Sequence, residues 1–210
     1  LGMIANSLNQ LGLIARSEGD LESARAYLDE CVQRLRPMGN PHALGIALAN
    51  VGVIALDQPD HEAAAAYLEE ALVNARSCGS RRGELFALAN LGVIAFEQGR
   101  ADECVARERE AAAIARELGD RSAAMTILWA LARLGESRGE LERVATLQGA
   151  GLALREALAA SRFLKQDRWD ALCARVREAL GDARFDQAFE RGRAMSLEEA
   201  MGMAETDSVT

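Results

Sequence analysis

The feature that most constrains this chain is an internal repeat. Written at a period of 40 residues, the first four blocks align without a gap. Three columns carry the alignment, one of leucine (Leu8, Leu48, Leu88, Leu128), one of small residues (Gly12, Gly52, Gly92, Ala132) and one of turn residues (Gly19, Pro59, Gly99, Gly139). Apolar residues at helical spacing between these columns predict, for each block, a helix, a tight turn, a longer helix and a loop.

The small residues have a physical role in such a block. Two antiparallel helices approach closely only where one of them presents Gly or Ala, and Gly12 and Ala24 are predicted to form such a pair. A single helical pair cannot bury its apolar face, so neighbouring pairs must stack into a solenoid with a convex and a concave side. The predicted fold is therefore an all-α solenoid of four helical pairs, at about residues 1–40, 41–80, 81–120 and 121–164.

These columns resemble the tetratricopeptide repeat. The first block carries the resemblance at Leu8, Leu11, Gly12, Ala15, Ala24, Leu28 and Cys31, and the second at Leu48, Val51, Gly52, Ala55, Ala64, Leu68 and Ala71. The pattern departs at Arg107, Glu108 and Gln148, which occupy usually apolar columns. The period, six residues longer than the usual 34, resembles the variant of bacterial signalling regulators and kinesin light chains. The resemblance implies a right-handed α-solenoid that binds a protein or peptide in its concave groove.

The end of the chain follows a different pattern. The 40-residue columns disappear at Gln166, and three shorter helices are predicted, at 167–180, 182–193 and 196–204. Ser196 and Glu199 have the spacing of a capping box, which specifies the start of the last helix. We predict capping helices over residues 165–204, in which Trp169, Phe185 and Phe189 cover the end of the solenoid, and a frayed tail over 205–210.

Part of this tail resembles large bacterial regulators of the LuxR type. The resemblance lies in residues 149–156, 180–185, 188–189, 192–194 and 196–200. Such regulators carry an ATPase ahead of their repeats, so the resemblance implies a sensor or oligomerisation arm, with nucleotide and DNA binding outside this chain. Because the helical pattern is already running at Leu1, we expect the chain to be a piece of a longer protein.

Composition excludes several classes of function. The chain has 32 acidic and 24 basic residues and a net charge of -8, and its basic residues are scattered, so direct nucleic-acid binding is not expected. No apolar stretch approaches 18 residues and no signal peptide is visible, so we expect no membrane association. Four widely spaced cysteines indicate neither a zinc site nor a disulfide framework and favour the cytoplasm.

Motifs for catalysis are missing from the sequence. It holds no phosphate loop, no H-E-x-x-H and no G-x-S-x-G, and its two histidines, His42 and His61, fall in or beside predicted turns. We therefore predict no catalytic residue, no metal and no cofactor. A hydrolase fragment completed by domains outside this chain is the alternative from another class.

Candidate binding residues lie on the first helix of each block. Two positions before the small-residue column stand Gln10, Asn50, Asn90 and Ala130, a ladder of amides suited to the backbone of a bound peptide. Specificity would come from residues on the same face, namely Asn6, Leu13, Val53, Phe86, Val93, Trp129 and Arg133. The column of Asn6, Ile46, Phe86 and Thr126 holds no cation, which disfavours a clamp for acidic chaperone tails.

Structural roles stay open for the same residues. The asparagines can instead bond across adjacent helices, Trp129 can pack against the capping helices, and Arg133 can be a surface ion pair. The sequence predicts a non-catalytic binding and regulatory module from a larger ATP-dependent transcriptional regulator, with self-association as a further mode. The alternative is a stand-alone adaptor that links partner proteins.

Overall fold

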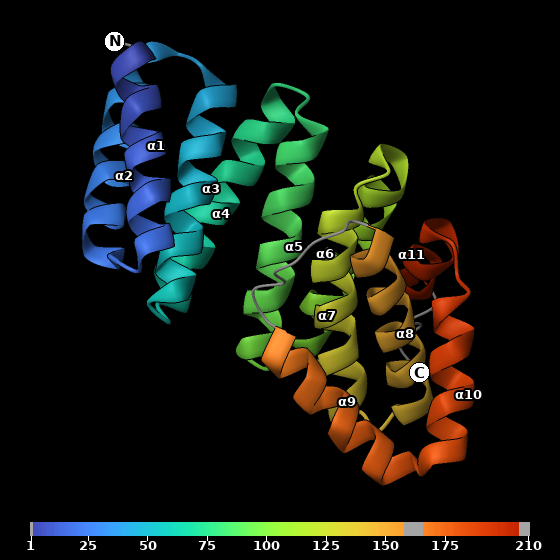
Figure 1. Cartoon of the computed structure of the whole chain (residues 1–210). Helices are drawn as coiled ribbons and strands as arrows, with labels where there is room; N and C mark the ends of the chain where they lie inside the picture. Colours follow the sequence, from blue (N-terminus) through green and yellow to red (C-terminus); the bar gives the residue numbers. More distant parts are fainter. Residues whose placement is uncertain (1, 158–165, 206–210) are drawn as a thin grey trace. The chain divides into compact units, whose positions relative to one another are not determined.

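The structure, a computed structural model, describes residues 2–157 and 166–205 of the chain (Figure 1). In these residues it contains eleven α-helices, one short 3-10 helix and no strand. The prediction of an all-α fold built from helical pairs is confirmed. The chain divides into two compact units, Leu1–Ile94 and Ala95–Thr210.

The first unit consists of two complete helical pairs and the start of a third. The pairs are α1 (Gly2–Glu18) with α2 (Leu21–Leu35) and α3 (Pro41–Asp57) with α4 (His61–Ser77), and α5 (Arg81–Glu97) begins the next. A 3-10 helix, Arg36–Met38, follows α2. The two helices of each pair pack closely on one another, and α2 also packs against α3, so successive pairs share one core.

Helix caps and turn glycines recur about every 20 residues and delimit the helices. Asp20, Asn40, Asp60 and Asp120 each accept a hydrogen bond from the backbone N–H group three residues later. Such N-caps satisfy amide groups that the first helical turn leaves unpaired. Glycines with positive φ, such as Gly19 at 84° and Gly139 at 73°, stand in the turns, where only glycine adopts this conformation without strain. Equal spacing of stops and caps gives α3, α4, α5 and α7 the same length of 17 residues.

The glycine column sets the distance between the two helices of a pair. A Cβ atom at Gly12 would lie 2.6 Å from Cγ of Leu28, and one at Gly52 would lie 2.7 Å from Cγ of Leu68. Both leucines are fully buried. The predicted close approach at Gly12 is therefore present, but its nearest neighbour is Leu28 and not Ala24, because the larger side chain reaches into the space that glycine leaves.

The second unit contains six further helices after the end of α5. They are α6 (Ala101–Leu118), α7 (Arg121–Ser137), α8 (Leu141–Ala157), α9 (Gln166–Leu180), α10 (Asp182–Arg193) and α11 (Leu197–Glu205). The capping box at α11 is confirmed: the Ser196 N–H donates to Oε2 of Glu199, and the Glu199 N–H donates to Oγ of Ser196. The bounds of α9 and α10 also match the prediction to within a residue. Of the predicted frayed tail, residues 206–210 lie outside the described residues.

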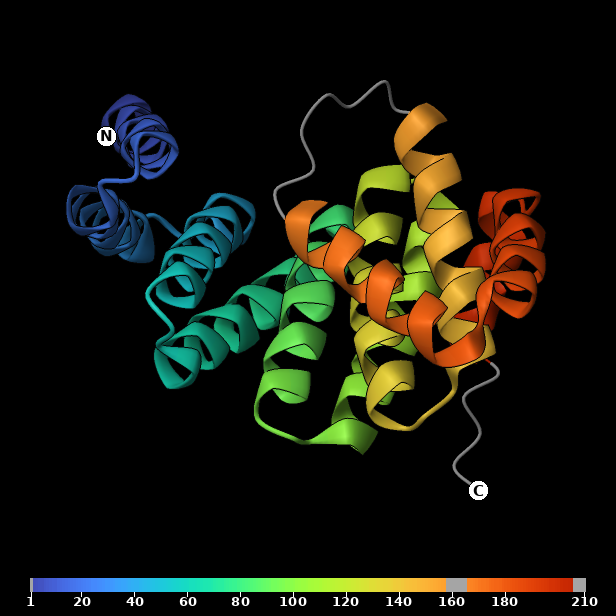
Figure 2. The ribbon, with the colours of Figure 1, turned by 60° about the horizontal axis from the view of Figure 1, so that its bottom comes forward.

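Helix α8 is enclosed by its neighbours. It packs against α7, α9 and α10, and residues 144–151 are all buried (Figures 1 and 2). Two glycines bring its backbone against that of α10: a Cβ atom at Gly149 would lie 1.9 Å from the carbonyl oxygen of Phe189, and one at Gly192 would lie 1.9 Å from that of Thr146. Helix α11 packs mainly on α6 and α7.

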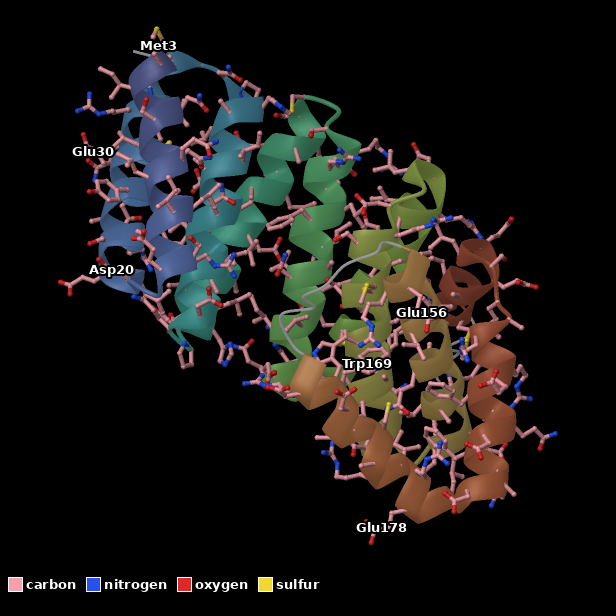
Figure 3. All side chains as sticks on the ribbon, viewed as in Figure 1. Met3, Asp20, Glu30, Glu156, Trp169 and Glu178 are labelled. Carbon is pink, nitrogen blue, oxygen red and sulfur yellow. The ribbon has the colours of Figure 1, made fainter. Side chains whose placement is uncertain are left out.

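Trp169 joins α9 to the two helices before it. Its ring lies 5.7 Å from that of Trp129 on α7, and a Cβ atom at Gly151 on α8 would lie 2.4 Å from its Cζ2. Figure 3 labels Trp169, whose side chain lies on the inner side of α9. Phe185 and Phe189 stack on each other at 5.3 Å between ring centroids on α10, with Phe185 fully buried. All three predicted aromatic residues thus contribute to the packing of the last helices.

Candidate binding hollow

A hollow of about 330 Å³ opens between α3, α4 and α5 in the first unit. Its buried residues are small, which leaves the space unfilled. The lining consists of Gly45, Ala49, Ala71, Ala75 and Gly83, together with His42, Ile46, Asn50, Ser80, Arg82 and Phe86. A concave apolar surface with a few polar groups at its edge is the usual form of a ligand site.

Gly45 lines the hollow at a column where the other repeats carry a side chain. The same column holds Ala5, Leu85 and Met125 in the other repeats, and all three of these side chains are buried. Gly83 allows α5 to approach α4 closely, since a Cβ atom there would lie 3.0 Å from Cβ of Ala75 on α4. The second repeat therefore combines close helix packing with an unfilled space beside it.

Two large apolar side chains stand at the mouth of the hollow. Ile46 on α3 is 46% exposed and Phe86 on α5 is 42% exposed. They occupy the same column, one repeat apart, so stacking of the repeats places equivalent positions of α3 and α5 on the same opening. An apolar side chain inserted between them would remove hydrophobic surface of both residues from water.

The polar lining residues carry hydrogen-bonding groups and positive charge. Asn50 offers an amide, Ser80 a hydroxyl, His42 an imidazole and Arg82 a guanidinium. None of these described lining residues carries a carboxylate. The nearby Glu84 is mostly buried and forms an ion pair with Arg81 at 3.0 Å. The lining thus suits a neutral or acidic segment.

The predicted amide ladder is partly engaged within the protein. Nδ2 of Asn50 donates to Oδ1 of Asn9 on α1 at 2.8 Å, and Nδ2 of Asn90 donates to the carbonyl oxygen of Phe86 at 2.8 Å. A side-chain amide has two N–H groups and one oxygen, so each asparagine keeps capacity for a ligand. Asn50 bonds across the adjacent helices α1 and α3, and it also lines the hollow.

The other candidate residues of the first unit differ in exposure. Asn6 and Gln10 are exposed, Leu13 and Val53 are half-buried, and Val93 is buried. Of the predicted groove residues, Asn50 and Phe86 line the hollow. A single groove formed by all the candidate residues stays a prediction.

Trp129 and Arg133 belong to the second unit. Trp129 is 4% exposed and packs on Trp169, while its Nε1 has no hydrogen-bond partner among the described residues. Arg133 forms an ion pair with Glu97 and places its guanidinium 4.3 Å from the ring centroid of Phe96. The structure therefore gives Trp129 a packing role against a capping helix and Arg133 an ion-pair role, the alternatives that the sequence left open.

Sequence reasoning missed most of the hollow. The sequence pattern marked Ile46 only as a position without charge and Ala71 only as a repeat position, and it marked neither Gly45, Gly83 nor Ala75. A signal was available in the column of Gly45, where glycine stands against Leu85 and Met125. Reading that column as a missing side chain would have pointed to a space in the second repeat.

Within residues 2–157 and 166–205, no group of three or more His, Cys, Asp or Glu side chains could hold a metal ion. In that part of the chain no helix is long and apolar enough to span a bilayer. The four cysteines are free thiols, and burial raises the pKa of Cys173 to about 11 and also raises that of Cys31.

Comparison with known proteins agrees with this architecture. Residues 3–77, which span α1 to α4, match the family described as Tetratricopeptide repeat. Two crystal structures of nearly identical TPR-like repeats, from a Podosopora anserina protein described as a kinesin light chain, are similar to the chain. One, a single-residue variant, has a TM-score of 0.64 at 16% identity over 90% of this chain and 92% of that one. The other has a TM-score of 0.63 at 15% identity over 97% of both chains.

These matches define the class of fold. The first two helical pairs carry the tetratricopeptide signature, and the chain has the fold of TPR-like repeats. No curated protein sequence matches the chain.

Proposed function

We propose that this chain is a non-catalytic module that binds a peptide or a protein segment in the hollow between α3, α4 and α5. The observation that carries the proposal is the apolar opening itself, where Ile46 and Phe86 are exposed over a floor of small residues. Folds of the tetratricopeptide type bury their own apolar faces by stacking, so large exposed apolar side chains beside an unfilled space favour a ligand.

The size of the hollow favours one side chain over a bulky ligand. Its volume of about 330 Å³ stands at the lower end of the range for ligand sites. We infer that one apolar side chain of the ligand enters between Ile46 and Phe86. Asn50 and Ser80 then hydrogen-bond its backbone, and Arg82 and His42 favour a segment without positive charge.

The wider role rests on the sequence resemblance alone. We propose that the chain is the sensor or oligomerisation arm of a larger bacterial, ATP-dependent transcriptional regulator that works in the cytoplasm. Support comes from the similarity of residues 149–156 and 180–200 to the sequences of such regulators. A sensor needs a ligand that binds two conformations unequally, whereas a stand-alone adaptor, the second candidate, needs affinity only.

Panning a phage library of random twelve-residue peptides against the chain tests the binding proposal. Enriched peptides are synthesised and their dissociation constants are measured by titration calorimetry with the wild type, Ile46→Asp and Phe86→Asp. Because a carboxylate at the mouth would be desolvated by an apolar ligand, each variant is expected to bind at least tenfold more weakly.

Val73→Asp is the matched control, since Val73 is an apolar residue of α4 that is 65% exposed and does not line the hollow. It is expected to bind like the wild type. The proposal fails if no peptide is enriched, or if the enriched peptides bind all four proteins equally well.

A further inference from the structure

The basic residues of the hollow lie at one of its ends. His42 and Arg82 are the second residues of α3 and α5, so they occupy equivalent positions one repeat apart. Ile46 and Phe86 follow four residues later on the same two helices, which places them one turn further along and on the same side. The hollow therefore has a basic rim at the start of both helices and an apolar mouth next to that rim.

Two sequence columns depart from the other repeats at these two helices. One column contains Gly2, His42, Arg82 and Ser122, and the other contains Asn6, Ile46, Phe86 and Thr126. Among the first helices of the four repeats, only α3 and α5 combine a basic side chain with a large apolar one at this spacing. These are also the two first helices that line the hollow, so the combination belongs to this site and not to the repeat in general.

The electrostatic character of the rim favours an anion. None of the described lining residues carries a carboxylate, and the carboxylate of the neighbouring Glu84 is paired with Arg81 at 3.0 Å. The dipoles of α3 and α5 add partial positive charge, since both helices begin at this end. Arg82 is exposed, so a carboxylate that binds there keeps part of its hydration and loses little free energy by desolvation.

We propose, on the basis of the peptide binding proposed above, that the hollow recognises a segment with an Asp or Glu two residues from the apolar side chain that enters it. One helical turn separates Arg82 from Phe86, which is about 6 Å along the axis. In an extended segment, side chains two residues apart point to the same side and are separated by about 6.6 Å. An apolar side chain at the mouth therefore brings the carboxylate to the Arg82 guanidinium, which donates charge-assisted hydrogen bonds to it.

The sequences of the panned peptides give the first test. Among peptides enriched on the wild type, an Asp or Glu is expected two positions to one side of an apolar residue several-fold more often than in the unselected library. Panning against Arg82→Glu is expected to enrich Lys or Arg at that position instead, because the charge at the rim is reversed.

Calorimetry with one enriched acidic peptide and its Gln or Asn counterpart measures the contribution of the rim. The wild type is expected to bind the acidic peptide about fivefold more tightly at low salt, and added salt should reduce this preference. Arg82→Gln is expected to bind both peptides alike. Arg34→Gln is the matched control, since Arg34 pairs with Glu30 on α2 and does not line the hollow, and it should keep the preference. Circular dichroism checks that both variants keep their helix content.

Two results would overturn the acidic register while leaving the peptide site in place. They are enriched peptides that lack an acidic residue at this position, and a preference for the acidic peptide that Arg82→Gln leaves unchanged. In both cases Ile46→Asp and Phe86→Asp would still weaken binding, so the failure is distinguishable from failure of the proposed function. A library that yields no enriched peptide would overturn both proposals.

Discussion

Replacing Glu108 by leucine is expected to stabilise the protein. Glu108 occupies the column of Leu28 and Leu68, is fully buried on α6, and has no hydrogen-bond partner for either carboxylate oxygen within the described coordinates. Burial raises the pKa of this carboxyl well above its ordinary value, because the low-dielectric surroundings disfavour the charged form. Even a neutral carboxyl loses its bonds to water here without replacing them.

The gain can be estimated from the two sides of the exchange. A buried polar group without a partner costs about 1–3 kcal/mol, and a buried leucine contributes about 1.5–3 kcal/mol relative to an exposed one. Because part of that apolar contribution is already made by the methylene groups of Glu108, we expect a net gain of about 2–4 kcal/mol near pH 4.5, and a larger gain at higher pH, where the unfolded chain loses this proton. For a chain of this length that raises the Tm by roughly 5–15 °C.

The same carboxyl sets a pH dependence. Between its unfolded pKa, near 4.5, and its higher folded pKa, the folded protein binds one more proton than the unfolded chain. Stability contributed by this proton is therefore fully present below pH 4.5 and is lost as the pH rises through the folded pKa, at up to about 1.4 kcal/mol per pH unit. Glu108→Leu is expected to remove this slope.

Urea unfolding followed by circular dichroism, at several pH values from 4.5 to 8.5, measures both effects. Glu178→Leu is the matched control, because Glu178 is exposed on α9 and points away from the helices (Figure 3), and its effect is expected to stay within about 0.5 kcal/mol. A Glu108→Leu protein that is less stable than the wild type, or that keeps the full pH slope, would refute the reasoning.

Three further changes follow from the packing and the hollow. Gly149→Ala is expected to destabilise the protein by at least about 3 kcal/mol in urea unfolding, because the new Cβ meets the Phe189 carbonyl oxygen. Gly202→Ala is the control: its new Cβ has no atom within 4 Å, so it should stabilise α11 by up to about 1 kcal/mol. Similar effects of the two changes would contradict the close contact of α8 and α10. Trp169→Ala is expected to lower stability by about 3–5 kcal/mol and to change the near-ultraviolet circular dichroism of Trp129, and an unchanged spectrum would contradict their contact. Asn50→Ala is expected to weaken binding of the panned peptides several-fold in calorimetry, because Asn50 lines the hollow. Asn90→Ala is expected to change binding less than twofold, because the Asn90 amide bonds to its own helix. Equal effects of the two changes would contradict a specific role of Asn50 in binding.

Much of the fold could be predicted because its determinants are local and periodic. Each determinant acts within one or two helices, so a single column of the repeat indicates it. Examples are the close approach at Gly12 and Gly52, the turn glycines, and the caps at Asp20 and Asn40. The capping box at Ser196 was predictable for the same reason.

The hollow and the last helices depended on information that no single column holds. The space beside Gly45 exists because three helices leave it unfilled, and the contact of Gly149 with Phe189 joins segments 40 residues apart that do not share a repeat. Asn50 shows that one side chain can bond across adjacent helices and also line the hollow.

Hydrogen exchange of the chain with and without a saturating panned peptide tests the central claim most directly. If the peptide occupies the hollow, it is expected to slow exchange of backbone amides in α3 around Ile46 and in α5 around Phe86, and to leave α9 and α10 unchanged. Slower exchange confined to other helices, with α3 and α5 unaffected, would contradict the assignment of the binding site to the hollow.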